Sequence, residues 1–392
     1  MRGFGKAPVI GLDLGSGYIK IAQIRETGKG LNLVNIGLLP TPKDSIENAK
    51  IVKPDEVAEA IRTLMRMYSF IGKRVVTAVS GQLVTVRTLV VDNLPKTELD
   101  EVIKWEMSKV LPYKIEDASF DYQIIGASPK TEGKKISVIA AAASLDIINS
   151  IVAAIKLAKL EPAAIEIESF AELRLLDYIL KDEYKNTIIV LVNSGHSFTS
   201  INIIEDGILR FTRIIPFGGE TLIKGISDKI GTNEKEAESL LVTMCNVDLE
   251  SVDKESDTFK VTTSIMPLIE EFVLELKRSV MYYRGLPSYS GKSFEIIMGG
   301  GTSKLKGLIK YIKTTLGVET KLNDFLYKAV VYNPKLFTEE YLLDMAPFFS
   351  VSVGLSMRET IERFEKVKRI KFSRKETKEK KAERITKRGR KK

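Results

Sequence analysis

The stretch Ile10-Gly11-Leu12-Asp13-Leu14-Gly15-Ser16-Gly17 decides the fold that this sequence predicts. It reads as a short apolar strand that ends near an acidic residue and runs into a turn of glycine and serine. The same pattern returns 180 residues later as Val190-Leu191-Val192-Asn193-Ser194-Gly195, and Tyr18 then lies over Phe198 in the returning strand. Two copies of one strand–turn–strand hairpin predict two related lobes that face a shared cleft.

The residue types of the first hairpin suit a phosphate group. Gly15 and Gly17, with Ser16 between them, let backbone N–H groups approach phosphate oxygens without hindrance from a Cβ atom. Asp13 at the end of the strand is suited to hold the water shell of a Mg²⁺ ion, which prefers oxygen ligands. Lys20 on the returning strand places a positive charge near the same phosphates. The alternative is a hairpin whose glycines only meet the geometry of its turn.

A third glycine-rich turn, Met298-Gly299-Gly300-Gly301-Thr302-Ser303, lies between an expected strand and an expected helix. Consecutive glycines let a nucleotide press against the backbone, and a helix N-terminus offers unpaired N–H donors. The turn is not a Walker A loop, because no Gly-Lys-Ser/Thr follows, and it is not a GxGxxG motif. Two hairpins and this turn in one order are more specific than any of them alone.

Composition and charge exclude several classes of protein. The chain of 392 residues has a formal charge of +9, but Glu365–Lys392 alone carries 15 Lys and Arg against 4 Glu, so the rest is near neutral at −2. Cys245 is the only cysteine and His196 the only histidine, which excludes a disulfide framework and argues against a Ser-His-Asp triad or a zinc site. Without a signal peptide or an apolar stretch that spans a bilayer, we expect a cytoplasmic protein.

Strand and helix patterns alternate along the chain, which favours an α/β fold. Ser144 is the expected N-cap of one helix. The predicted strands are 9–14, 18–24, 75–79, 84–91, 120–125, 136–142, 164–167 and 294–298, and the predicted helices begin at Pro54 and Pro95 or cover 145–160, 170–180 and 305–316.

With these motifs the sequence resembles the actin-like ATPase superfamily, and within it the PilM family of type IV pilus assembly proteins. Gly11–Lys20 is similar to the first phosphate motif, Asn193–Thr199 to the second and Gly299–Gly301 to the adenosine motif. The segment Leu94–Tyr122 resembles the inserted small subdomain that this family shares with the division protein FtsA, and Phe348–Arg358 resembles the usual C-terminus.

The resemblance covers about residues 7–360 and implies an actin-like, duplicated ribonuclease-H-like fold with nucleotide in a central cleft. It implies two large subdomains with one insertion in each. The expected parts are a first large subdomain of 7–80, 144–186 and 345–363, a small subdomain of 81–143, a second large subdomain of 187–220 and 294–344, a helix-rich insertion of 221–293, and a disordered basic tail of 364–392.

The ligands that the resemblance implies are ATP and Mg²⁺. Asp13 is expected to hold the Mg²⁺ ion through water, and Glu238 to lie on the ribose. The remaining expected contacts are Gly15, Ser16, Gly17 and Lys20 on the phosphates, Asn193, Gly195 and Thr199 opposite them, and Gly299, Gly300 and Gly301 on the nucleoside side.

Two departures from the family pattern predict weak or absent ATP hydrolysis. Asn193 stands where the second phosphate motif usually begins with Asp, and Ala237–Leu241 keeps the glutamate of an Ala-Glu-x-x-Lys run but loses its lysine. Glu166 and Glu168 fall where the superfamily often places its water-positioning residue, and Glu166 is the catalytic candidate. The alternative for both is a solvated or salt-bridged carboxylate.

The family also implies a partner, the short cytoplasmic N-terminal peptide of PilN, a membrane protein of the pilus platform. Its groove is expected between the Ser80–Ala143 region and the first large subdomain, flanked by Trp105 and Tyr113. Other platform proteins are further expected partners. Lys366–Lys392 predicts attraction to an anionic membrane surface, with a solubilising tail as the alternative. No specific nucleic-acid binding is expected, because Phe372 is the only aromatic residue of the tail.

We therefore predict an ATP-binding scaffold of the type IV pilus, or of a related type II secretion system, at the cytoplasmic face of the inner membrane. An FtsA-like protein that polymerises at the membrane is the first alternative, although the tail lacks the apolar residues of a membrane-binding amphipathic helix. A sugar-kinase-type phosphotransferase is the second, and Asn193 weakens it.

Overall fold

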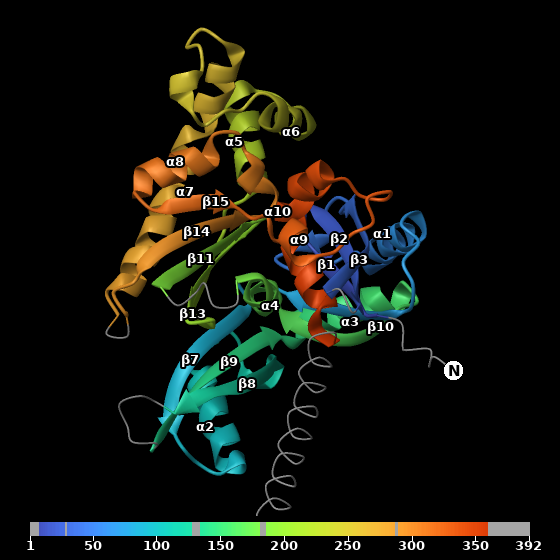
Figure 1. The fold of residues 1–392 in the computed structure, drawn as a ribbon, viewed down its shortest axis with the longest axis vertical. Helices are drawn as coiled ribbons and strands as arrows, with labels where there is room; N and C mark the ends of the chain where they lie inside the picture. Colours follow the sequence, from blue (N-terminus) through green and yellow to red (C-terminus); the bar gives the residue numbers. More distant parts are fainter. Residues whose placement is uncertain (1–7, 28–29, 128–133, 181–185, 287–288, 360–392) are drawn as a thin grey trace, which may run out of the picture.

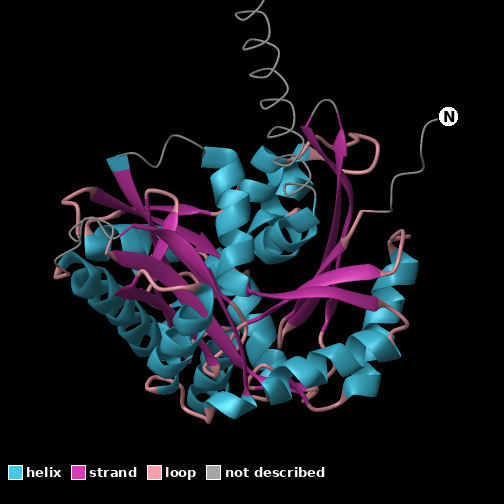
Figure 2. Cartoon of the chain, turned by 90° about the horizontal axis from the view of Figure 1, so that it is seen from below, coloured by secondary structure: helices cyan, strands magenta, loops and turns pink. Residues whose placement is uncertain are grey.

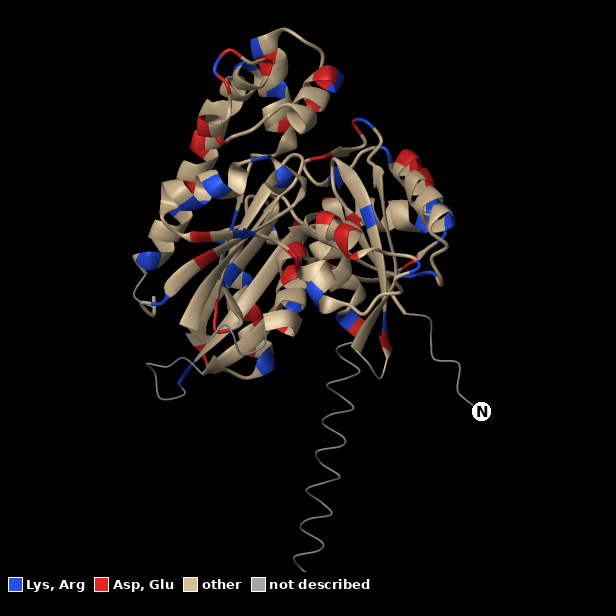
Figure 3. Ribbon diagram, turned by 45° about the horizontal axis from the view of Figure 1, so that its top comes forward, with Lys and Arg blue, Asp and Glu red and all other residues tan. Residues whose placement is uncertain are grey.

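The structure is a computed structural model that describes residues 8–27, 30–127, 134–180, 186–286 and 289–359. Two five-stranded sheets stand on either side of central helices, and a three-stranded sheet lies below them (Figure 1). Figure 2 shows helices both between the sheets and on their outer faces. Basic and acidic residues alternate along the ribbon of the outer helices (Figure 3). Within the described residues, no helix combines the length and the apolar composition that crossing a membrane requires.

The hairpin at Asp13 supplies the central strand of the first sheet and one of its neighbours. The two strands of the hairpin pair antiparallel, with Asp13 opposite Lys20, and the other neighbour of the first strand pairs with it in parallel. In spatial order the strands are β10 (Glu161–Ile167), β6 (Arg74–Val79), β1 (Ile10–Leu14), β2 (Tyr18–Thr27) and β3 (Gly30–Pro40).

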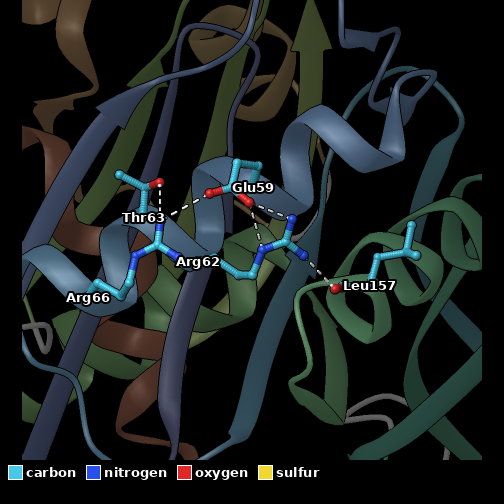
Figure 4. Close-up of polar contacts among 5 residues, drawn as sticks. All are labelled: Glu59, Arg62, Thr63, Arg66 and Leu157. Carbon is cyan, nitrogen blue, oxygen red and sulfur yellow. Dashed lines mark hydrogen bonds and ion pairs between the residues drawn. The ribbon is translucent and has the colours of Figure 1, made fainter.

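The outer face of the first sheet is covered by α1 (Pro54–Met67) and α3 (Leu145–Leu157). Arg62 of α1 donates to the Leu157 carbonyl at the end of α3 at 2.8 Å, which satisfies a carbonyl that no helical N–H reaches (Figure 4). Glu59 accepts from Arg62 and Arg66, and these hydrogen bonds lower the pKa of its carboxyl. The ion pairs with Glu59 hold both arginines along α1, and the hydrogen bond of Arg62 to Leu157 connects α1 to α3. We call this sheet, with α1, α3 and α4 (Glu168–Leu180), the first lobe.

The second sheet repeats the topology of the first. Its central hairpin places Asn193 opposite Ser200, which is the register of Asp13 and Lys20 shifted by the repeat. In spatial order the strands are β13 (Ile208–Ile215), β12 (Thr199–Glu205), β11 (Thr187–Ser194), β14 (Ser293–Gly299) and β15 (Glu319–Leu322). The sheet forms the second lobe with the helices α5 (Gly219–Ile230), α6 (Glu234–Thr243), α7 (Asp257–Arg284) and α8 (Leu308–Leu316).

The small sheet is fully antiparallel and has one face covered by a helix. It consists of β7 (Val84–Asp92), β9 (Lys135–Ser144) and β8 (Ala118–Ala127), and α2 (Lys96–Ser108) packs on it. Ser144 at its end is the N-cap of α3, as predicted, because its side chain accepts from the Asp146 N–H. The strands of the sheet lie between residues 84 and 144, while the exact subdomain boundaries stay predictions.

The prediction of a helix over 305–316 was wrong about its first residues. The turn at Gly299–Gly301 runs into a short 3₁₀ helix (Gly301–Lys304), and α8 begins only at Leu308, after Gly307 with a φ of +82°. The third turn therefore does not lie at the N-terminus of an α-helix. The strands β3, β4 (Ile46–Glu47), β5 (Lys50–Ile51), β13 and β15 and the helix α9 (Phe325–Ala329) were not predicted either.

The helix α10 (Glu339–Ser356) packs against β1, β2, β6 and α4 and also reaches β14 of the second lobe. Its backbone comes very close to its neighbours, since a Cβ atom on Gly354 would lie 2.0 Å from the Ala171 carbonyl oxygen of α4. On β1, a Cβ atom on Gly11 would lie 1.9 Å from the Ser352 carbonyl oxygen. Glycine at both positions is thus required by the packing.

We expect Gly354→Ala to lower the free energy of unfolding by roughly 1–3 kcal/mol, and with it the midpoint of urea unfolding, because the added methyl group would overlap the backbone of α4. Gly126→Ala on β8 is the matched control, since its Cβ atom would meet nothing within 4 Å. Equal midpoints for the two variants would contradict this description of α10.

Candidate functional site

A cavity of about 510 Å³ lies between the two hairpins. It collects residues from both lobes and from the third turn, which are far apart in the chain. The residues predicted as nucleotide or metal contacts that line it are Asp13, Gly15, Ser16, Gly17, Lys20, Asn193, Gly195, Glu238, Gly300 and Gly301.

Asp13 and Lys20 form an ion pair on the floor of this cavity. Lys20 Nζ lies 2.6 Å from Asp13 Oδ2, and both side chains are largely buried. The pair arises because the two residues face each other across the β1–β2 hairpin. In this arrangement an ammonium and a carboxylate neutralise one another, and each remains in reach of a ligand of opposite charge.

The two hairpin turns touch each other across the cavity. Ser16 Oγ lies 2.9 Å from Ser197 Oγ, and Ser197 in turn donates to Glu220 at 2.9 Å in the first turn of α5. A Cβ atom on Gly17 would lie 2.7 Å from the His196 Cβ atom, so only glycine fits this contact. Ser197 and Glu220 were not predicted as site residues, because only the folded chain brings them beside the first turn.

The third turn packs onto the second hairpin. Gly300 has a φ of +80°, and a Cβ atom there would lie 2.1 Å from the Ser194 carbonyl oxygen. Its N–H donates to the Pro347 carbonyl of α10 at 2.7 Å, and Thr302 Oγ1 donates to the Gly195 carbonyl at 2.8 Å. Gly299, in contrast, faces Asn323 and α10 and does not line the cavity.

Thr199 is also not brought to the cavity. The residue is fully buried on β12, and its hydroxyl group lies 2.8 Å from both the Phe217 carbonyl oxygen and Ser194 Oγ. Its polar atom is therefore engaged inside the second lobe. The sequence pattern indicated a hairpin correctly at this point but not the direction of this side chain.

The structure corrects the placement of Glu166. Its buried carboxylate is held by Arg174 at 2.8 Å and Arg358 at 2.6 Å, and it does not line the cavity. The salt-bridged alternative is therefore what the structure shows for this residue. Glu168, two residues later at the start of α4, does line the cavity, and its carboxylate accepts from the Asn193 amide at 2.8 Å.

Glu168 and Glu172 stand one helical turn apart on α4 beneath the cavity. Desolvation by the surrounding protein raises the pKa of the Glu168 carboxyl, and the negative charge of Asp13 raises it further. Burial raises the pKa of Glu172 to about 8, with the charge of Glu168 adding to the effect. Ser350 of α10 donates to Glu172 Oε1 at 2.8 Å, whereas Oε2 has no hydrogen-bond partner among the described residues.

A second hollow of about 400 Å³ lies between the small sheet and the two lobes. Five residues line both this hollow and the cavity, namely Val79, Ser80, Glu168, Ser200 and Ile214. Trp105 does not line the hollow and is 61% exposed. Tyr113 does not line it either, and its hydroxyl donates to the Leu83 carbonyl at 2.8 Å. The hollow is also lined by Gln82, Val84, Thr85, Val86, Arg87, Val110, Pro112, Ile167, Ser169, Asn202, Thr212 and Arg213.

We expect the stability of the wild-type chain to fall, relative to Glu172→Gln, as the pH rises from about 4.5 to about 8. The raised pKa means that the folded state keeps a proton that the unfolded state releases, so the contribution of Glu172 is complete below pH 4.5 and is lost through pH 8. The difference between the two proteins should change by roughly 2–4 kcal/mol over this range in urea unfolding. A difference that does not change with pH would contradict a buried, protonated Glu172.

Comparison with known proteins gives relatives that cover most of the chain. The family described as type IV pilus assembly protein PilM matches residues 11–360. The cell division protein FtsA of Bacillus subtilis (strain 168) is 22% identical, over 78% of this chain and 76% of that protein.

Solved structures agree with this result. A PilM-PilN type IV pilus biogenesis complex has 25% sequence identity and a TM-score of 0.79, covering 90% of this chain and 99% of that chain. The ethanolamine utilization protein EutJ from Carboxydothermus hydrogenoformans, at 16% identity and a TM-score of 0.52, covers 91% of each chain and supports the fold alone. The predicted actin-like fold is thus confirmed, and the chain belongs to the family of type IV pilus assembly proteins PilM.

Proposed function

We propose that this protein is a scaffold of type IV pilus assembly that binds ATP in the cavity and a PilN-like peptide in the second hollow. The observation that carries the proposal is the likeness to a PilM-PilN complex over 99% of that chain. The two concave sites of this chain, which share a wall, then give each ligand a place.

The size and the lining of the cavity support the proposal that a nucleotide binds there. Its volume of about 510 Å³ lies in the range of small-molecule sites. Gly15, Ser16 and Gly17 offer backbone N–H groups and Lys20 a charge for the phosphates. At the other end, the apolar Leu241 and Val242 beside Glu238 and Gly301 suit a base and its ribose.

The cavity also suits a Mg²⁺ ion that accompanies the phosphates. Such an ion keeps several waters and takes one or two protein carboxylates. Of the three carboxylates that line the cavity, Asp13, Glu168 and Glu238, the first two lie near each other, since the charge of Asp13 adds to desolvation in raising the pKa of Glu168. When bound, the ion would offset the charge of the phosphates, and Asp13 would hold it through water.

We propose that binding, rather than turnover, serves the function. Asn193 offers no carboxylate, and its amide donates to Glu168 and engages that group. Leu241 stands where the Ala-Glu-x-x-Lys run has its lysine, and the loss of that lysine weakens contacts to the nucleoside as well. Nucleotide binding then acts by shifting the population of conformations that present the second hollow.

The lining of the second hollow supports the proposal that an extended peptide binds there. Its walls combine apolar side chains, among them Val84, Val110 and Ile214, with the cations Arg87 and Arg213. A peptide can place apolar side chains against the former and an acidic group near the latter. The hollow adjoins the Ser80–Ala143 region, where the resemblance to the family places the groove for the N-terminal peptide of PilN.

Through a membrane-anchored partner of this kind, the protein would lie at the cytoplasmic face of the inner membrane. Attraction of Lys366–Lys392 to anionic lipids would add to this, although those residues lie outside the described part of the chain. The likeness to FtsA keeps one alternative open, a division protein that polymerises. Nucleotide-dependent filaments in sedimentation assays, without binding of a PilN-like peptide, would favour it.

We expect Asp13→Ala to abolish Mg²⁺-dependent ATP binding in isothermal titration calorimetry, because it removes a cavity carboxylate and leaves Lys20 unpaired. Asp228→Ala is the control, since Asp228 is exposed on α5 and does not line the cavity. An unchanged affinity of the Asp13 variant would mean that the nucleotide binds elsewhere.

We expect Val110→Trp to weaken binding of a PilN-like N-terminal peptide at least tenfold in the same assay, because the larger side chain fills the hollow. Val90→Trp on β7 is the matched control, as Val90 is 54% exposed and does not line the hollow, while Val110 is 42% exposed. Equal affinities for both variants would place the peptide on another surface.

A further inference from the structure

His196 stands in the second hairpin turn, where this turn meets the first turn and the start of α5. It is the only histidine of the chain, and it lines the cavity. Its ring lies on the first turn, since Cγ and Nδ1 are 3.0 and 3.4 Å from the position that a Cβ atom on Gly17 would take. A Cβ atom on Gly219 would lie 3.6 Å from His196 Nδ1 and 3.8 Å from Thr302 Oγ1 of the third turn. The imidazole therefore lies where all three turns of the cavity come together.

The backbone of this turn is held by α5, whereas the imidazole is left to a ligand. The Gly219 N–H donates to the Gly195 carbonyl at 3.0 Å, and the Glu220 N–H donates to the His196 carbonyl at 2.8 Å. Among the described residues, no hydrogen-bond partner is found for the imidazole nitrogens of His196. A fixed backbone with an unpaired ring is the arrangement of a binding residue rather than of a core histidine.

The lysines nearest the phosphate turns are already paired with carboxylates. In the described part of the chain, Lys20 of the first hairpin forms an ion pair with Asp13, and Lys304 after the third turn forms one with Asp344. Both lysines line the cavity. A protonated His196 would add a positive charge at the contact between the two hairpin turns, where phosphate groups are expected.

The groups that face His196 decide how its protonation responds to the surroundings. On α5, the hydrogen bond from Lys224 lowers the pKa of the Glu220 carboxyl, and the charge of His196 contributes to this lowering. Glu220 in turn favours the protonated imidazole, since opposite charges attract. The other charged groups of the cavity around the turns are Asp13, Lys20 and Glu168. A pH dependence of binding can therefore be assigned to His196 only where it disappears with the histidine.

We propose that His196 is a phosphate-binding residue whose protonated form contacts the nucleotide, so that nucleotide binding takes up a proton and weakens as the pH rises. The inference rests on the proposed function of the cavity. A protonated imidazole donates from both nitrogens, and phosphate oxygens accept such hydrogen bonds. Charge-assisted hydrogen bonds are about twice as strong as neutral ones. Histidine ordinarily changes its charge near about pH 6.5, so this contact would respond to pH close to neutrality.

Nuclear magnetic resonance of the wild type tests the contact directly. With labelled histidine and no histidine tag, the full-length protein gives the ring signal of His196 alone. We expect the midpoint of its titration to rise by about one pH unit when Mg²⁺ and a non-hydrolysable ATP analogue are bound, which corresponds to a tenfold preference of the ligand for the protonated form. A midpoint that stays in place or falls would overturn the inference.

Isothermal titration calorimetry with the same analogue measures the consequence for affinity. From about pH 6 to about pH 8, the affinity of the wild type should fall roughly fivefold more than that of His196→Gln. The phosphate groups of the analogue and Glu168 titrate in both proteins, so the difference isolates the histidine. His196→Lys keeps a positive charge over this range and should show the pH dependence of His196→Gln at a higher affinity. Ser197→Ala changes the same turn but leaves the ring, and it should keep the pH dependence of the wild type.

The outcomes separate this inference from the proposed function. Equal pH dependence in the wild type and His196→Gln, with both proteins binding the analogue, would overturn the inference and leave the proposed function intact. If the wild type binds the analogue at no pH, the proposed function fails and the inference fails with it. If His196→Gln does not fold, the resonance titration of the wild type decides.

Discussion

The close backbone packing of α10 against β1 and α4 is the contact on which the rest of the structure depends. Gly11 and Gly354 allow it, because a Cβ atom at either position would overlap a carbonyl oxygen. The same helix accepts the Gly300 N–H through the Pro347 carbonyl and so fixes the third turn. One helix thus sets the distance between the first hairpin, the third turn and the second lobe, and the cavity is the space that remains between them.

Burial raises the pKa of the carboxyl groups of Glu168 and Glu172 at this cavity. Asp13 and Glu168 line the cavity, and among the described residues Lys20 forms an ion pair with Asp13 there, while the buried Glu172 beside them has a raised pKa. Such a site is costly without a ligand, since buried charge needs compensation. The phosphate groups and the metal ion that we propose for this cavity would supply both signs of charge.

Much of the fold could be predicted from the repeat, because the hairpins at Asp13 and Asn193 share a register and a topology. What a linear pattern could not give is the direction of single side chains. Glu166 and Glu168 look alike in the sequence, but β10 ends at Ile167, and the next residue opens a helix that points into the cavity. The contact of Ser16 with Ser197 joins the two lobes, and only the tertiary structure shows it. The edge strands β3 and β13 mix polar and apolar residues, which hides their period.

Hydrogen–deuterium exchange of the full chain with each ligand tests the central claim most directly, namely that two neighbouring sites hold a nucleotide and a peptide. With Mg²⁺ and the ATP analogue, the account predicts slower exchange in the turns 15–17, 195–198 and 300–302, which line the cavity. With a PilN-like peptide, it predicts slower exchange at 84–87 and around Val110, which line the hollow. Protection confined to other segments, or none with either ligand, would contradict it.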